Sequence, residues 1–356
     1  MKKPEEKPKT RRTRLPHVDL LLFTKYMSVL LNSGLPIDEA LQILDQQAKG
    51  PFKQILDSLS GAVRSGRTLA DGMAEYPRAF SIVYVNLIRA GESSGSLQKN
   101  LDQLSLQLQK EHEMNAKIRG AMMYPSVILF AGLSITVGIV VFILPSISGI
   151  FTSLNVELPL PTRLMLWLSD TLRAHGIIIV PAMVAGIWAL VTFLRLKFVK
   201  PVTHRIILRL PVIGKLSMKT NLARFTRLMG TLLMSGIPIQ EALGISETVL
   251  KNVRFRELFR LAHEEVVRGK TLSSQLESDP RLVPPMALRL IRVGEETGTL
   301  GEMFTYLANF YEVEVDDSTR NLPALLEPVL IVGIGLMVGG LALAILSPIY
   351  KIVGSV

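Results

Sequence analysis

The sequence predicts an all-α polytopic membrane protein with two repeated cytosolic helical bundles and three transmembrane helices. Three observations lead to this fold class. Of the 356 residues, 48% are apolar and only 20% are charged, which is more apolar surface than the core of a soluble domain takes up. Three uncharged apolar stretches are long enough to cross a bilayer. The segment that precedes the first stretch is repeated before the last one.

The N-terminal tail, residues 1–19, is rich in lysine and arginine, and we expect it to be disordered. Basic segments beside a cytosolic leaflet gain about 1 kcal/mol per residue from anionic lipid, which is therefore the expected partner of the tail. No aromatic side chains alternate with these charges, so nucleic acid is not expected. Asp19 and Lys25 interrupt the apolar run that follows, and no cleaved signal peptide is predicted.

The internal repeat defines two cytosolic bundles, residues 20–125 and 222–327. The sequence FTKYMSVLLNSGLPIDEAL from Phe23 matches FTRLMGTLLMSGIPIQEAL from Phe225. One inserted residue follows in the second copy, and the match then continues to the start of an apolar stretch in each. The matched pairs include Gly66 with Gly269, Pro77 with Pro280, Gly91 with Gly294, Glu92 with Glu295, Gly95 with Gly298, and Pro125 with Pro328.

Each copy has the pattern of short helices joined by tight turns. Pro36 is suited to the start of a helix, with Asp38 and Glu39 in the first turn. The apolar stripe of this helix is Ile37, Leu41, Leu44 and Ala48.

A long helix ends each copy, and it is expected to begin directly after a glycine-containing turn. Ser96 is expected to cap it in the first copy, and Thr299 with Glu302 has the spacing of a capping box in the second. The apolar residues of the two helices share one spacing: Leu97, Leu101, Leu104 and Leu108, and Leu300, Phe304, Leu307 and Tyr311. An antiparallel bundle with short loops is expected.

The transmembrane helices are predicted at residues 126–145, 176–195 and 328–349. Their apolar stretches contain no Asp, Glu, Lys, Arg or His, which argues against an ion or substrate path. Small residues four apart allow close helix packing, within the chain or with a second copy, in a homo-oligomer. These pairs are Ser134 with Gly138, Ala182 with Gly186, and Gly335 with Gly339.

The distribution of basic residues predicts the orientation. The linker 196–221 is strongly basic and is placed in the cytosol, whereas the loop 146–175 has few basic residues and is placed outside. The N-terminus is then cytosolic, and the tail 350–356 is external or periplasmic. The second transmembrane helix returns the chain to the cytosol, which explains why it has no counterpart in the repeat.

Catalytic, cofactor-binding and metal-binding residues are not predicted. Cysteine is absent, and the five histidines have no metal-ligand spacing. Residues 61–68 have the glycine spacing of a phosphate-binding loop, but Arg67 replaces its lysine, and Glu264 replaces its first glycine in the second copy. No strand precedes either segment. We therefore expect turns between helices, with Thr68 and Thr271 as caps.

The glycine-containing turns carry acids in both copies, and two interpretations are open. The carboxylates could serve the turn itself, or they could contact a partner or a cation. The candidate partner-contact residues are Gly91, Glu92, Gly95, Gly294, Glu295, Glu296 and Gly298.

A second group of acids precedes the membrane. Glu111 and Glu113 match Glu314 and Asp316, and they are interpreted as a solvated face or as a docking surface. Glu327 directly precedes the third predicted span, where the dipole of a helix N-terminus would favour an acid.

From about Leu20 to the C-terminus, these features resemble the type II secretion system protein F family. The resemblance rests on the paired blocks from Phe23 and Phe225, the turns AGESSGSL and VGEETGTL, the segments AMMYPSV and LLEPVLI, and the external LNVELPLPTR. This family includes the inner-membrane platform proteins of type IV pili and of competence pseudopili. Ser274 stands where the first copy has Asp71, as Glu264 does for Gly61, so equivalent roles of the two copies do not follow.

The resemblance implies a non-enzymatic scaffold in the cell inner membrane that supports pilus assembly or protein secretion. Its expected partners are a cytosolic hexameric assembly ATPase, pilins or pseudopilins, and other inner-membrane assembly proteins. Two rival functions are a membrane-anchored helical interaction or signalling protein and a small-solute transporter. The transporter would need polar groups at membrane depth.

Overall fold

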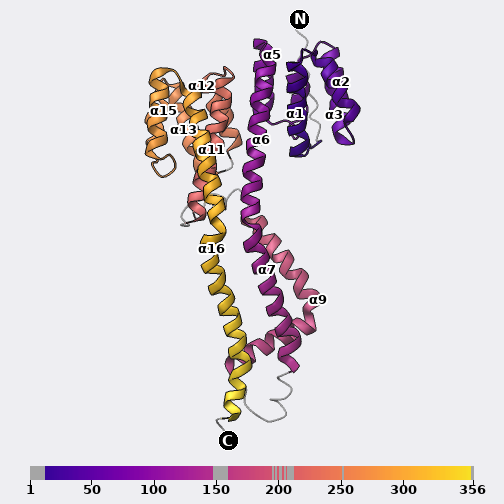
Figure 1. Ribbon diagram of the computed structural model, residues 1–356, viewed down its shortest axis with the longest axis vertical. Coiled ribbons are helices and arrows are strands. Elements are labelled where there is room, and N and C mark those ends of the chain that lie inside the picture. The colour runs from indigo at the N-terminus through magenta and orange to yellow at the C-terminus, as the bar shows by residue number, and fades with distance from the viewer. Residues whose placement is uncertain are drawn as a thin grey trace. The chain divides into compact units, whose positions relative to one another are not determined.

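The computed structural model describes residues 13–146, 159–194, 212–250 and 252–353, with four single residues between 195 and 211. All regular structure in these residues is helical, as predicted (Figure 1). The chain forms two compact units, and the first contains both repeated modules up to Ala116 and Asp316. The first module consists of α1 (His17–Asn32), α2 (Ile37–Gln47), α3 (Pro51–Arg64), α4 (Leu69–Ala74), α5 (Ile82–Ser94) and the start of α6 (Leu97–Ala121).

The second module has the same order of helices, so the structure reproduces the sequence repeat element by element. Its first helix begins within the predicted linker 196–221, and α1 likewise begins within the predicted tail 1–19. The second module consists of α11 (Ile213–Met234), α12 (Ile239–Val249), α13 (Val253–Val267), α14 (Leu272–Leu276), α15 (Pro285–Thr297) and the start of α16 (Leu300–Val353).

Each module has an aromatic core built around the phenylalanine that begins the repeated block. Phe23 packs against Phe80 with ring centroids 6.2 Å apart, and Phe225 packs edge-on against Phe304 at 5.7 Å. Both residues are 1% exposed. The predicted stripe of α2 is only partly correct, because Ala40 joins Leu41 and Leu44 in the core, whereas Ala48 lies beyond the helix end.

The two modules differ where the first helix of each meets the last. In the first module the Ser28 hydroxyl donates to Asp102, which also accepts from Asn32 Nδ2 at 3.3 Å. Gly230 and Thr305 occupy the equivalent places in the second module. A Cβ atom on Gly230 would lie 2.8 Å from Thr305 Oγ1, so these two helices approach more closely than a side chain at this position allows. The first module is therefore joined by polar contacts at a place where the second is joined by close packing.

The second unit contains α7 (Met123–Gly138), the short π-helix η1 (Ile139–Ile143), α9 (Leu160–Leu194) and the remainder of α16. Among the residues that the structure describes, two helical stretches are long and apolar enough to cross a membrane, Leu97–Ser146 and Leu300–Ser347. Their most apolar windows are only 11% and 17% buried, which is unlike the core helix of a soluble protein. Such exposed apolar surface is suited to lipid.

The second predicted span, residues 176–195, lies almost entirely within α9, several of whose side chains are outside the described part of the chain. Its role as a third transmembrane helix remains a prediction. α9 already begins at Leu160, so the second half of the predicted loop 146–175 is helical. Within this unit, the Thr162 hydroxyl donates to the Ala344 carbonyl over 2.6 Å and so joins α9 to α16.

The interpretation of Glu327 was wrong. α16 is continuous from Leu300 to Val353, and Glu327 therefore lies in the middle of a helix, far from any helix N-terminus. Pro323 and Pro328 do not interrupt it. The dipole of a helix N-terminus cannot explain this acid.

The predicted caps are correct in one case only. The Thr68 side chain accepts from the Asp71 amide over 3.1 Å at the start of α4. Thr271 makes no side-chain cap on α14. The hydroxyls of Ser96 and Thr299 lie 2.7 Å from Ser94 and Thr297, respectively, and in the described residues neither forms the expected cap.

Candidate interaction site

The acids repeated in the two turns bind the backbone of their own modules. Glu92, on α5, accepts from the Leu69 and Ala70 amides over 2.6 and 2.9 Å. These amides are the unpaired donors at the N-terminus of α4, and a carboxylate satisfies both of them and the helix dipole. The interpretation that this acid serves the turn is thus supported by geometry.

Glu295 has the same role in the second module. Its carboxylate accepts from the amides of Leu272 and Ser273, and also from the Ser273 hydroxyl over 2.7 Å. Glu295 replaces the cap that was expected from Thr271. By contrast, the neighbouring Glu296 is exposed and forms no hydrogen bond or ion pair with the described residues, so it is available to a partner.

The turn glycines divide into two pairs with different functions. A Cβ atom on Gly91 would lie 2.8 Å from Leu97 Cα, and one on Gly294 would lie 2.8 Å from Met303 Cγ, so both permit close contact with the long helix. Gly95 and Gly298 end their helices at φ values of 69° and 74°, which other residues rarely adopt. All four glycines therefore have structural functions.

The segment with phosphate-loop spacing is the end of a helix followed by a turn. Gly66 has φ 82°, and the Arg67 amide donates to the Ala62 carbonyl, which is the hydrogen bond of a helix C-terminus. Asp71 lies in the first turn of α4, where the hydrogen bond with Thr68, supported by Arg89, holds the pKa of its carboxyl below the ordinary value. In the part of the chain that the structure describes, no group of three or more acids and histidines could hold a metal ion.

The two modules contact one another through polar side chains of α6, α11 and α16. Arg224 donates to Asn115 Oδ1 over 2.6 Å, which joins α11 to α6. Glu312 of α16 receives Arg227 Nε at 2.7 Å and Lys110 Nζ of α6 at 3.8 Å. Glu312 thereby bridges cations from both modules.

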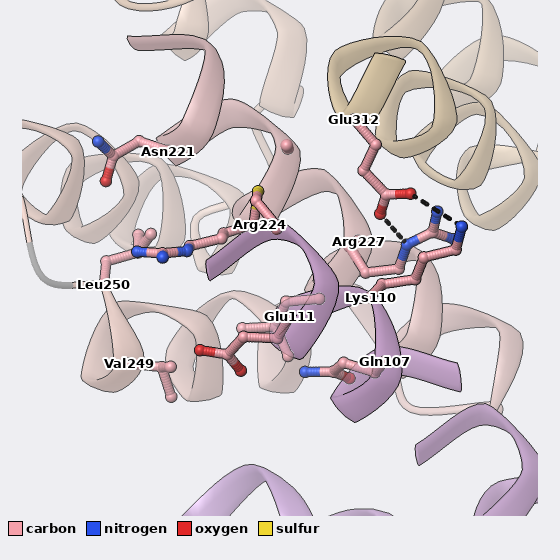
Figure 2. Close-up of a pocket in the computed structure, with 12 residues that line it drawn as sticks. Gln107, Lys110, Glu111, Asn221, Arg224, Arg227, Val249, Leu250 and Glu312 are labelled. Carbon is pink, nitrogen blue, oxygen red and sulfur yellow. Dashed lines mark hydrogen bonds and ion pairs between the residues drawn. The ribbon is translucent and has the colours of Figure 1, made fainter. Parts of the chain in front are cut away.

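A hollow of about 70 Å³ lies at this contact, and Figure 2 shows the side chains around it. Arg227 and Lys110 converge on Glu312 at one side, whereas Arg224 extends toward Leu250 on the other. Two buried atoms that line the hollow, Gln107 Oε1 and Arg224 Nε, have no hydrogen-bond partner among the described residues. An unsatisfied buried polar group costs about 1–3 kcal/mol, so these two atoms reduce the stability that the module contact contributes.

The membrane-proximal acids fall into separate environments. Glu111 lines the hollow, and Glu113 accepts from Gln109 Nε2 over 2.9 Å. Glu314 pairs with Lys219 at 2.6 Å. Asp316 also has a partner within the chain. Glu111 is thus placed at the module contact, and docking to another protein remains a prediction for all four acids.

The glycines among the small residues expected to pack in the spans have open space beside them in the described part of the chain. A Cβ atom on Gly138, Gly186, Gly335 or Gly339 would meet nothing within 4 Å. Gly132 instead lies against α16, because its Cβ would be 3.7 Å from Ile334. Packing of the predicted pairs against a second copy remains a prediction.

The residues of the module contact were missed as a site in the sequence. Arg224 and Arg227 were counted only as part of the basic segment that indicates orientation. The available signal was the departure of Arg224 from the repeat, since the equivalent residue of the first copy is Leu22, whereas Arg227 corresponds to the similarly charged Lys25.

Comparison with known proteins identifies relatives across the whole chain. The profile of the family described as type II secretion system (T2SS), protein F matches residues 23–145 and 225–348, which are the two modules with their apolar helices. The matched ranges agree with the repeat seen in both the sequence and the structure.

Individual relatives align over nearly the full length. A type IV pilus assembly protein PilC of Thermus thermophilus is 36% identical over 95% of this chain and 83% of its own. A protein of the same name from Pseudomonas aeruginosa is 30% identical, over 94% and 90%. A type II secretion system protein F of Pseudomonas aeruginosa is 31% identical, over 94% and 82%.

Proposed function

Because the chain belongs to the type II secretion system protein F family, we propose that it is the inner-membrane platform on which a type IV pilus or type II secretion filament is assembled. The observation that carries this proposal is the match of both modules and both candidate spans to one family, with full-length relatives named for pilus assembly and secretion. The two apolar helices, together with the named relatives, support an inner-membrane position.

The finer proposal is that the two modules receive motion from a cytosolic assembly ATPase. The basic linker supports a cytosolic position for both modules, and the N-terminus would share it. Support for relative movement of the modules comes from the hollow at their contact, where Gln107 Oε1 and Arg224 Nε lack hydrogen-bond partners among the described residues. Each module would move largely as a unit around its aromatic core.

The membrane helices would contact pilins or pseudopilins. Large apolar side chains of α7 and α16 are exposed, including Phe130 at 75% and Leu336 at 73%. Apolar helices of assembly subunits could pack on such side chains as readily as lipid does. The continuous helix α16 connects the second module to its candidate span without a loop, which supports transmission of movement along the chain.

The ATPase contact can be tested at the turns without disturbing the fold. Glu296 and its counterpart Ser93 are exposed, whereas the adjacent Glu295 and Glu92 hold helix N-termini. The double variant Ser93→Lys, Glu296→Lys would change the surface charge and leave both caps in place. The expected result is loss of ATPase co-purification and of filament assembly, with normal membrane levels of the protein.

Charge reversal on a surface away from the turns is the matched control. Lys53, on α3, is 52% exposed, and Lys53→Glu is expected to leave co-purification unchanged. If the turn variant bound the ATPase and assembled filaments as well as the control, the turns would not be the contact. If deletion of the whole protein left filament assembly intact, the platform function itself would be wrong.

A further inference from the structure

The contact between the two modules joins non-equivalent sides of the repeat. The first module contributes α5 and α6, and the second contributes α11 and the end of α12. Arg224 of α11 binds Asn115 of α6, Val249 of α12 lines the same hollow, and α5 also contacts α12. The contact is therefore head-to-tail, and it leaves the α1 side of the first module and the α15–α16 side of the second without repeat-equivalent partners.

The α1 side carries an exposed apolar stripe. Leu22 is 41%, Tyr26 is 47% and Val29 is 54% exposed, and with Val18 they follow one face of α1. We call these four residues the α1 stripe. At the equivalent positions of the second module, Leu228 and Thr231 are each only 4% exposed. The same helix face is thus covered in one module and uncovered in the other.

The α15–α16 side carries a matching apolar surface. Met286 is 46%, Val293 is 48%, Tyr306 is 54% and Val313 is 59% exposed, and we call these residues the α16 patch. Met286 and Tyr306 also line a shallow hollow at the surface. Lys110 of α6, the counterpart of Val313, lies at the contact with the second module.

At one position on each uncovered surface, an apolar residue stands where the contact within the chain has a cation. In the repeat, Arg224 at the contact within the chain corresponds to Leu22 of the α1 stripe, and Lys110 at the same contact corresponds to Val313 of the α16 patch. The hollow at the contact is also lined by apolar residues, among them Leu228 and Val249, so the exchange concerns only the two corresponding positions. A cation is thus exchanged for an apolar residue once on each side, and this pairing supports a contact between the two uncovered surfaces.

We infer that the α1 stripe of one molecule packs against the α16 patch of a second copy of this chain. The contact would repeat between molecules the arrangement that the modules adopt within each molecule. Molecules in one membrane share an orientation, and a head-to-tail contact generates a ring when its rotation closes. The inference does not depend on the coupling to an ATPase proposed above.

Site-directed crosslinking tests this contact directly, because the chain contains no cysteine. Two differently tagged full-length copies, one with Leu22→Cys and one with Val313→Cys, are co-expressed, and the membranes are treated with a short thiol crosslinker. The expected product joins the two tags. Lys53→Cys with Val313→Cys is the control pair, since Lys53 is exposed on a different helix of the same module.

The crosslinking result distinguishes this contact from other occupants of the surfaces. Crosslinking of Leu22→Cys to itself, with none to Val313→Cys, would indicate a two-fold contact and overturn the inference. No mixed product above the Lys53→Cys control would overturn it as well, including when either surface crosslinks to a different protein.

Charge substitution supplies a second, independent measurement. In the purified full-length protein in lipid nanodiscs or detergent, Leu22→Lys and Val313→Glu are each expected to weaken self-association by about tenfold or more, as is typical of a buried contact residue. Combining them between molecules places opposite charges together and should restore much of the loss. Helical circular dichroism separates this effect from misfolding. Unchanged association of both folded single variants would contradict the inference.

Discussion

Arg227 Nε donates to Glu312 Oε1 over 2.7 Å, and Arg227 Nη2 donates to Asn309 Oδ1 over 2.5 Å. The guanidinium is nearly buried, since Arg227 is 8% exposed. The equivalent residue of the first module, Lys25, is exposed. This ion pair therefore belongs to the second module alone, where it ties α11 to α16 beside the contact with the first module.

Replacing one member of this pair leaves the other charge without its partner. We expect Glu312→Gln to lower the free energy of unfolding of the detergent-solubilised protein by about 3 kcal/mol, because a nearly buried arginine loses its counterion. The double variant Arg227→Met, Glu312→Gln should be closer to the wild type than the sum of the single changes. Denaturant unfolding in a double-mutant cycle measures the difference. Simple additivity would show that the pair is not coupled.

The paired glycines of the turns should tolerate no side chain. Gly91→Ala would place a Cβ 2.8 Å from the Leu97 backbone, and Gly294→Ala would meet Met303 at the same distance. We expect Gly91→Ala to lower the free energy of unfolding by about 1–3 kcal/mol, because the backbone at Leu97 must move to make room. Gly294→Ala should cost less, because part of the obstruction is a flexible side chain. Thermal unfolding of the full-length protein measures both.

Gly61 provides the control for these two substitutions. It lies inside α3, and a Cβ there would meet nothing within 4 Å. Gly61→Ala is therefore expected to stabilise by about 0.5–1 kcal/mol through helix propensity. A loss of stability of the size expected for Gly91→Ala would show that packing does not explain the difference.

The repeat could be predicted in detail because its signals are local. The Pro36 helix start and the glycines at helix ends act through the backbone of a few neighbouring residues, and the structure confirms these positions. The exposed apolar spans follow from composition in the same way. Such features require no knowledge of what lies across the bundle.

The caps and the module contact depend on residues distant in sequence. Glu295 lies on α15, the helix that follows α14, and its carboxylate accepts from the amides at the start of α14. It takes the place of the nearer Thr271, because a carboxylate can accept from two amides at once. The continuity of α16 through Pro328 could not be predicted from the residues beside Glu327. Proline removes one hydrogen bond and usually bends or ends a helix, yet α16 continues on both sides of it.

Loss of the Glu92 cap should loosen α4 locally. Glu92→Ala removes the acceptor of two amides, and we expect a cost of about 1–2 kcal/mol. Hydrogen exchange at Leu69 and Ala70 should accelerate more than in the rest of the first module. Glu296→Ala, which removes an exposed acid from the equivalent turn, is the control and should change exchange little. Equal protection of α4 in both variants would contradict the capping role.

Tyr84 should make the first module sensitive to alkaline pH. Its hydroxyl lies 2.9 Å from Thr24 Oγ1, and the Thr24 hydroxyl itself donates to the Leu20 carbonyl, so Tyr84 is the donor. Burial raises the pKa of Tyr84 well above its ordinary value of 10.0, because the phenolate would lose its hydration.

The sign of the pH effect follows from which state keeps the proton. Above about pH 10 the unfolded chain releases the Tyr84 proton while the folded chain retains it, so stability falls by up to about 1.4 kcal/mol per pH unit. Below the pKa that Tyr84 has in the unfolded chain, both states keep the proton, and the stability contributed by Tyr84 is fully present.

Tyr84→Phe should lower the free energy of unfolding by about 1 kcal/mol at neutral pH, through the lost hydrogen bond, and should remove this part of the alkaline dependence. Denaturant unfolding of both proteins between pH 8 and about 11 isolates the contribution of Tyr84 from those of the other tyrosines and lysines. Parallel stability curves for the two proteins across that range would show that Tyr84 ionises as readily in the folded chain as in the unfolded one.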